Sequence, residues 1–143
     1  PLEILIPYIT VLGNSERYRI FVRNKNKVNY SLKNVQTDVV RSFQHSLVVN
    51  EIDVVVGGIS TCLIESSKEH CLPISVQHGQ DYGLHLITDF LCVPVYCEQE
   101  LKNLLDGLSC ADFDQKVSKI QSIHLCNEPV KLADAWHKTL GAI

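Results

Sequence analysis

The stretch Asp53–Val76, which reads D-V-V-V-G-G-I-S-T-C-L-I-E-S-S-K-E-H-C-L-P-I-S-V, decides the fold. It opens on a continuously apolar, β-branched run, and this predicts a buried strand over Asp53–Val56. Two glycines interrupt the run. A helix over Cys62–His70 and a second strand over Pro73–Gln77 are then expected. The order strand, helix, strand is typical of a parallel sheet covered by helices.

The same alternation continues on both sides of this stretch. The opening segment Leu2–Leu12 favours a helix despite Pro7, with a strand over Leu2–Ile6 as the alternative. The other expected strands are Arg19–Arg23, Leu32–Val35 and Val93–Tyr96, the last at a sheet edge because of Pro94. The other expected helices run from Thr37 or Asp38 to Asn50, and over Gly83–Phe90, Glu98–Leu105, Phe113–Ile120 and Leu132–Leu140. We therefore predict an α/β fold, a Rossmann-like three-layer sandwich with a mostly parallel sheet and helices on both faces.

Length and composition indicate one folded domain over residues 1–143. The chain is 45% hydrophobic and 20% charged, which excludes a disordered or low-complexity protein. No apolar run approaches the roughly 20 residues that cross a bilayer. The six cysteines form no C-x-x-C pair, so we expect reduced thiols and a cytoplasmic location. Because the chain begins with Pro1 and has no Met, we expect it to be a piece of a longer protein.

Basic residues gather in one segment of an otherwise acidic chain. Residues 17–41 hold seven Lys and Arg against one acid, whereas the net charge of the whole chain is −3. A short basic cluster of this kind suits a small polyanion such as a diphosphate better than a long nucleic acid. A solvated charged loop is the alternative reading.

The loop after the first buried strand carries the candidate chemistry. Gly57 and Gly58 allow a ligand to approach the backbone closely, and Ser60 and Thr61 follow at the start of a helix. Amide groups at a helix start attract phosphate, and hydroxyls there can contact phosphate oxygens. Glu65 lies one turn further along, where a carboxylate can accept hydrogen bonds from a ribose diol. Ordinary helix capping by Ser60 and Thr61 is the alternative.

Asp53–Val76 resembles the nucleotide-sugar-binding half of the GT-B glycosyltransferases, which has the same strand, small residues, hydroxyl pair, Glu-bearing helix and Pro-containing strand. The resemblance implies that Ser60 and Thr61 contact the donor diphosphate and that Glu65 binds the ribose. It implies contacts to the donor sugar from the loop that follows the second strand, through His78, Gln80 and Asp81. It makes Arg23 or Lys25 a candidate for binding the diphosphate.

The function expected from this resemblance is metal-independent transfer of a sugar from a nucleoside diphosphate sugar. We expect no cofactor and no metal, and we identify no catalytic base in this chain. The expected partners are a missing N-terminal domain or partner subunit, through which the protein could associate peripherally with a membrane, and no nucleic acid. Three alternatives stay open: half of a nucleotide-sugar 2-epimerase, a non-catalytic donor-binding subunit of a split glycosyltransferase, and an unrelated flavodoxin-like module.

Overall fold

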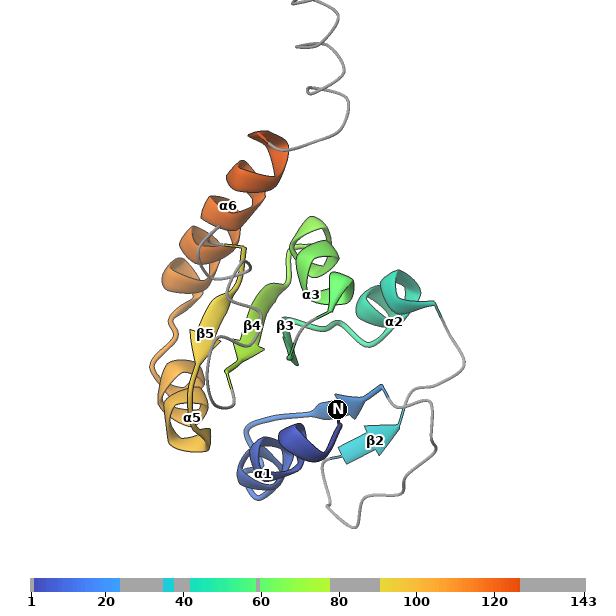
Figure 1. Cartoon of the computed structure of the whole chain (residues 1–143), viewed down its shortest axis with the longest axis vertical. Helices are drawn as coiled ribbons and strands as arrows, with labels where there is room; N and C mark the ends of the chain where they lie inside the picture. Colours follow the sequence, from blue (N-terminus) through green and yellow to red (C-terminus); the bar gives the residue numbers. More distant parts are fainter. Residues whose placement is uncertain (1, 24–34, 38–41, 59, 78–90, 127–143) are drawn as a thin grey trace, which may run out of the picture.

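The computed structural model describes residues 2–23, 35–37, 42–58, 60–77 and 91–126, and its strands form two parallel sheets. The first sheet pairs β1 (Ile20–Val22) with β2 (Val35–Thr37). The second has β4 (Leu72–Val76) between β3 (Val54–Gly57) and β5 (Val93–Val95). Figure 1 shows both sheets among the helices. These elements confirm the predicted α/β, Rossmann-like class.

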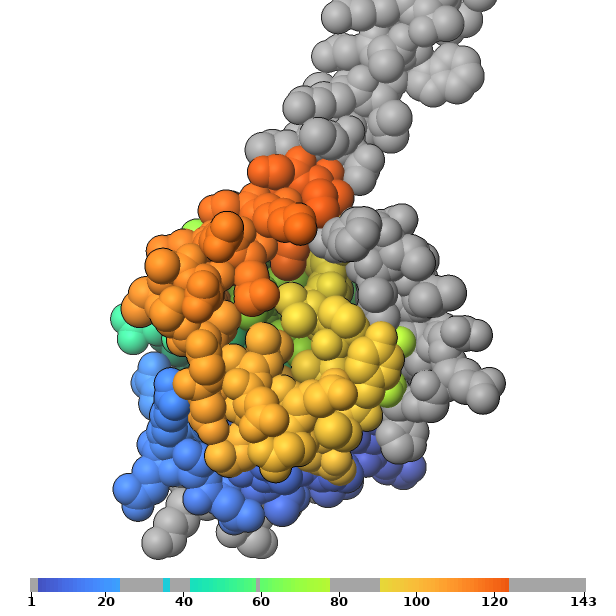
Figure 2. Space-filling view, turned by 90° about the vertical axis from the view of Figure 1, so that its left-hand side faces the viewer, coloured from blue at the N-terminus to red at the C-terminus, as the bar shows by residue number. Residues whose placement is uncertain are grey.

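The middle strand β4 organises the core, because all five of its residues are buried. Successive side chains of a strand point to opposite faces. One face of β4 packs with three helices: α1 (Leu2–Gly13), α5 (Glu98–Asp106) and α6 (Cys110–Cys126). Figure 2 shows α5 and α6 covering one side of the molecule, with α1 beside them. The buried residues of this cluster are Tyr8, Leu12, Leu72, Ile74, Val76, Val95, Leu101, Val117 and Ile120.

The opposite face of the second sheet is covered by α3 (Thr61–Ser66), which continues into the 3-10 turn η1 (Ser67–Glu69). Leu63 of α3 is 1% exposed and packs with Cys92 and Val55. Helices thus lie on both faces of the sheet, as the sequence predicts. This packing also holds α3 at the carboxyl end of β3.

Side-chain caps explain where two further helices begin. The Ser109 hydroxyl accepts a hydrogen bond from the Asp112 amide at 3.1 Å and donates one to the Asp112 carboxylate at 2.7 Å, at the start of α6. The Ser42 hydroxyl accepts from the His45 amide at the start of α2 (Phe43–Val49). Each cap satisfies an amide that the first helical turn leaves without a partner.

Several predicted boundaries are wrong. The described part of the second strand is Val35–Thr37, two residues beyond the predicted end at Val35, and residues 32–34 lie outside the described part. Thr37 pairs with Val22 in this strand, so it does not cap the predicted helix, and the alternative cap Asp38 lies outside the described residues. The helix predicted over Cys62–His70 ends as a 3-10 turn, because His70 adopts a left-handed conformation with φ of 57°.

Two predictions about burial and length also need correction. The strand β3 is half-buried instead of fully buried, and among the described residues it pairs with a neighbour on one side only. The last described helix, α6, extends beyond the predicted Phe113–Ile120 at both ends. The helices predicted over Gly83–Phe90 and Leu132–Leu140 lie outside the described residues.

A polar cluster joins the end of α5 to the chain before β1. The Tyr18 hydroxyl donates to the Asp106 carboxylate, which also pairs with Arg17 at 3.4 Å and Lys102 at 2.9 Å. Burial, followed by the hydrogen bond to Asp106, raises the pKa of Tyr18 to about 12. The hydrogen bonds from Tyr18 and Lys102 lower the pKa of Asp106. The cluster therefore fixes the position of β1 relative to α5.

Candidate functional site

The glycine turn leaves the sheet at the carboxyl end of β3, where α/β proteins bind ligands. Gly57 is the last residue of β3 and is in register with Ser75 of β4. The Ser75 hydroxyl donates to the Gly58 carbonyl at 3.1 Å and accepts from the Gln77 side-chain amide at 2.8 Å. Ser75 is 0% and Gln77 4% exposed. A buried polar relay from β4 therefore fixes the backbone of the turn.

Two hydroxyl residues follow the turn, and they have different roles in the structure. Ser60 is the N-cap of α3, and its hydroxyl oxygen accepts from the Cys62 amide at 3.2 Å. The Leu63 amide donates to the Ser60 carbonyl at 3.1 Å. The side chain of Thr61 is exposed. Since a serine hydroxyl that accepts a hydrogen bond retains its own proton, Ser60 can cap the helix and still donate to a ligand.

The carboxylate of Glu65 is held by a residue that the sequence did not point to. Its Oε2 atom accepts from the Gln44 side-chain amide of α2 at 3.2 Å. No ion pair involves Glu65 among the residues that the structure describes, so its carboxylate keeps acceptor capacity for a diol. Gln44 lies in a short polar stretch of α2 with no recognisable motif, and only the packing of α2 against α3 brings it to Glu65.

Arg23 lies at the end of β1, and its guanidinium stacks over the Phe43 ring with the carbon 5.8 Å from the centroid. Phe43 precedes Gln44 in the first turn of α2, so Arg23 and Glu65 contact neighbouring residues of one helix. Lys25, His78, Gln80 and Asp81 lie outside the described residues. The structure thus brings Gly57, Gly58, Ser60, Thr61 and Glu65 together on one segment, and the ligand roles of all the candidates stay predictions.

Two of the described cysteines are buried thiols that stay protonated near neutral pH. Cys62, Cys71, Cys92, Cys97 and Cys110 are all free thiols. Burial raises the pKa of Cys71 and of Cys92 to about 11, which keeps both protonated near neutral pH. His70 lies on the surface, 3.0 Å from the carboxylate of Asp114. Within the described ranges there is no cluster of three metal-ligating side chains, and no helix is both long and apolar enough to cross a bilayer.

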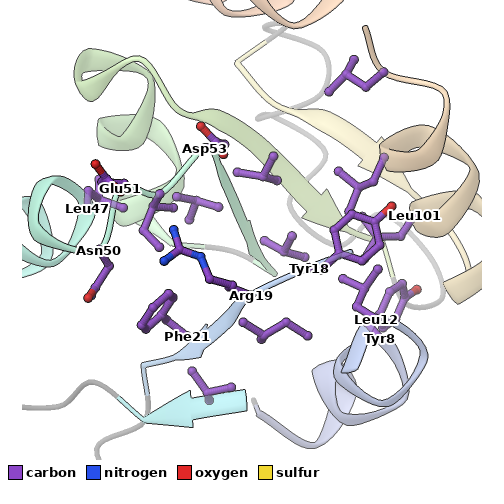
Figure 3. A pocket seen from close by; sticks show the side chains of 18 of the residues that line it. Tyr8, Leu12, Tyr18, Arg19, Phe21, Leu47, Asn50, Glu51, Asp53 and Leu101 are labelled. Carbon is purple, nitrogen blue, oxygen red and sulfur yellow. The ribbon is translucent and has the colours of Figure 1, made fainter. Parts of the chain in front are cut away.

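A large cavity of about 810 Å³ lies elsewhere, between β1 and β3. Its walls include Tyr18 to Arg23, Asp53 to Val56 and apolar residues of α1 and α5 (Figure 3). Of the predicted site residues that the structure describes, Arg23 lines it, whereas Gly57, Gly58, Ser60, Thr61 and Glu65 do not. The glycine turn and Glu65 therefore lie outside the lining of this cavity.

Comparison with known proteins adds no family assignment. No protein-family model, no curated protein and no solved structure matches this chain. The resemblance to the GT-B glycosyltransferases therefore rests on the sequence pattern, which is strongest over Asp53–Val76.

Proposed function

We propose that this chain is the donor-binding half of a metal-independent glycosyltransferase, and that it binds a nucleoside diphosphate sugar beside the carboxyl end of β3. The observation that carries the proposal is the arrangement of Gly57, Ser60, Thr61 and Glu65 on one turn and one short helix. A hydrogen bond from the Ser75 hydroxyl holds the turn, and a hydrogen bond from the Gln44 side-chain amide orients Glu65. Because these groups are already ordered, a ligand can bind them without the loss of conformational entropy that ordering would cost.

The chemical role of each group follows from its place. The amides of Cys62 and Leu63 already bond to Ser60, so the Ser60 and Thr61 hydroxyls are the groups expected to contact the diphosphate. Hydrogen bonds to the diphosphate stabilise the negative charge that develops on it as the leaving group. Glu65 lies four residues after Thr61, about one helical turn from the phosphate contacts, where a carboxylate accepts from ribose hydroxyls without facing the phosphate charge.

Calorimetry with uridine, cytidine and guanosine diphosphates tests the proposal. One of the three should bind, and Glu65→Ala should lose at least tenfold in affinity, about 1.4 kcal/mol. Glu69→Ala, which removes an exposed carboxylate from the adjoining η1 turn, is the matched control and should bind like the parent.

A second nucleotide makes the ribose role specific. The parent chain should bind the 2′,3′-dideoxy form of the nucleotide more weakly than the ribonucleotide. The Glu65→Ala variant should bind the two forms equally, because the carboxylate and the diol form one interaction. If both proteins lose the same factor on removal of the diol, Glu65 does not bind the ribose. If none of the diphosphates binds, the donor-site proposal fails.

A further inference from the structure

We propose that Gln44 is a second ribose-binding residue, and that its pair with Glu65 selects a ribonucleoside diphosphate donor over a 2′-deoxyribonucleoside diphosphate. The inference rests on the proposed donor site, to which it adds a residue and a substrate class. The Gln44 side-chain amide donates to Oε2 of Glu65 at 3.2 Å. The two residues come from α2 and α3, which pack against each other (Figure 1).

The contact with Glu65 fixes the direction of the Gln44 carboxamide. A carboxylate only accepts hydrogen bonds, so the NH₂ group of Gln44 faces Glu65 and the carbonyl oxygen is turned away. The amide nitrogen carries a second proton in the same plane, which points beside the carboxylate. The described residues give this amide no second hydrogen-bond partner, and Gln44 is exposed. The pair therefore presents a donor on Gln44 next to acceptors on Glu65.

A hydroxyl group fits this arrangement, because it donates one proton and accepts through its lone pairs. One ribose hydroxyl can donate to the Glu65 carboxylate and accept the second proton of Gln44, while its neighbour donates to the other carboxylate oxygen. Linked hydrogen bonds of this kind polarise and strengthen one another. A deoxy carbon at either place makes no such bond and leaves polar groups of the site unpaired. Sites built to bind a hydroxyl discriminate strongly against an analogue that lacks it.

The charge of the pair favours a diol over a phosphate group. Gln44 is neutral, and within the described ranges no Lys, Arg or His forms an ion pair with Glu65. The carboxylate charge therefore faces a ligand without a neutralising cation, and it repels a phosphate placed beside it. Glu65 is half-buried, so water weakens its hydrogen bonds less than those of an exposed carboxylate. A neutral sugar hydroxyl is the group that this pair can bind.

Calorimetry with the full 143-residue chain tests the inference. The probes are uridine, cytidine and guanosine diphosphates, each with its 2′-deoxy and 3′-deoxy forms. For the diphosphate that binds, the parent chain should bind the 2′-deoxy form at least tenfold more weakly than the ribonucleotide.

Gln44→Met keeps an unbranched side chain that suits a helix, but it removes the amide protons. This variant should bind the ribonucleotide at least threefold more weakly than the parent does. The deoxy form that lacks the hydroxyl facing Gln44 should bind the variant and the parent equally. Glu65→Ala should still lose the whole preference for the diol, because the exposed Gln44 amide then has no partner to orient it.

The three forms of the nucleotide separate a direct contact from a positioning role. If Gln44 only holds Glu65 in place, Gln44→Met weakens all three forms by the same factor, and this result would overturn the inference. Gln99→Met is the matched control, because Gln99 is another exposed helical glutamine, on α5, whose amide donates to the Asn103 side chain at 2.8 Å. This control should leave all three affinities unchanged.

Failure of this inference differs from failure of the donor site. If a diphosphate binds and Glu65→Ala weakens it, but Gln44→Met binds every form like the parent, the donor site stands and the role of Gln44 is overturned. Equal binding of the ribonucleotide and its 2′-deoxy form by the parent chain overturns the selection for ribonucleotides. If no diphosphate binds the parent chain, the donor site fails and the role of Gln44 fails with it.

Discussion

Replacing Ser75 with alanine tests whether β4 holds the glycine turn in place. The Ser75 hydroxyl is fully buried, and it links the Gly58 carbonyl at 3.1 Å to the Gln77 side-chain amide at 2.8 Å. The variant would leave one acceptor and one donor without this partner. A buried polar group that loses its hydrogen bond costs about 1–3 kcal/mol, and the half-buried Gly58 carbonyl costs less than the buried Gln77 amide because water can reach it, so the expected loss in the free energy of unfolding is about 2–4 kcal/mol.

Ser66→Ala is the matched control for this prediction. Ser66 is also 0% exposed, but its hydroxyl makes one bond, to the Leu63 carbonyl at 2.7 Å. That variant should cost about 1 kcal/mol, because only one group loses its partner. Urea unfolding followed by circular dichroism measures both free energies, and a difference of about 2 kcal/mol shifts the midpoint by about 1 M for a slope near 2 kcal/mol/M.

The two variants also differ in their expected effect on ligand binding. Ser75→Ala releases the Gly58 carbonyl and should weaken nucleoside diphosphate binding by the folded protein, whereas Ser66→Ala should not. If Ser75→Ala costs no more stability than Ser66→Ala, the relay from Gln77 to Gly58 does not anchor the turn. The reasoning about a preorganised site would then be refuted.

Three further predictions concern other parts of the fold. Ser46→Ala should leave the melting temperature unchanged or raise it, because the buried Ser46 hydroxyl has no hydrogen-bond partner among the described residues. Tyr18→Phe should reduce the loss of stability at alkaline pH. The pKa of Tyr18 is raised to about 12 in the folded protein, so its contribution to stability is complete below its unfolded pKa near 10 and is lost as the pH rises towards 12. A variant with the same urea midpoints as the parent chain between pH 9 and 12 would contradict this. Iodoacetamide at pH 8 should label exposed Cys97 well before buried Cys71, whose pKa is about 11. Mass spectrometry of timed samples measures the two labelling rates, and equal rates would contradict this prediction.

Local sequence patterns predicted the elements that depend on neighbouring residues. The strand expected over Asp53–Val56, the helix expected over Glu98–Leu105 and the opening helix each follow from local sequence patterns, and each lies within one residue of its predicted bounds. The end of the second strand and the start of α2 could not be predicted in this way. Thr37 has the chemistry of a helix cap, but its pairing with Val22 is made across chain segments and overrides that preference.

The candidate site shows the same division. The spacing of Gly57, Ser60 and Glu65 is a property of the sequence, because one strand end and one helical turn bring these residues together locally. The partners that orient them, Ser75 and Gln44, come from elements distant in the chain and carry no local signal.

The sequence by itself determined the α/β class, the parallel order of strands and helices, and the place of the glycine turn, since all three follow from short-range periodicity and backbone preference. Only the tertiary structure decided that β3 stands at one end of its sheet among the described residues and that residues of β1 and β3 line one cavity. The physical reason is that hydrogen bonds between strands and the space between layers depend on how distant segments pack, which no local pattern encodes.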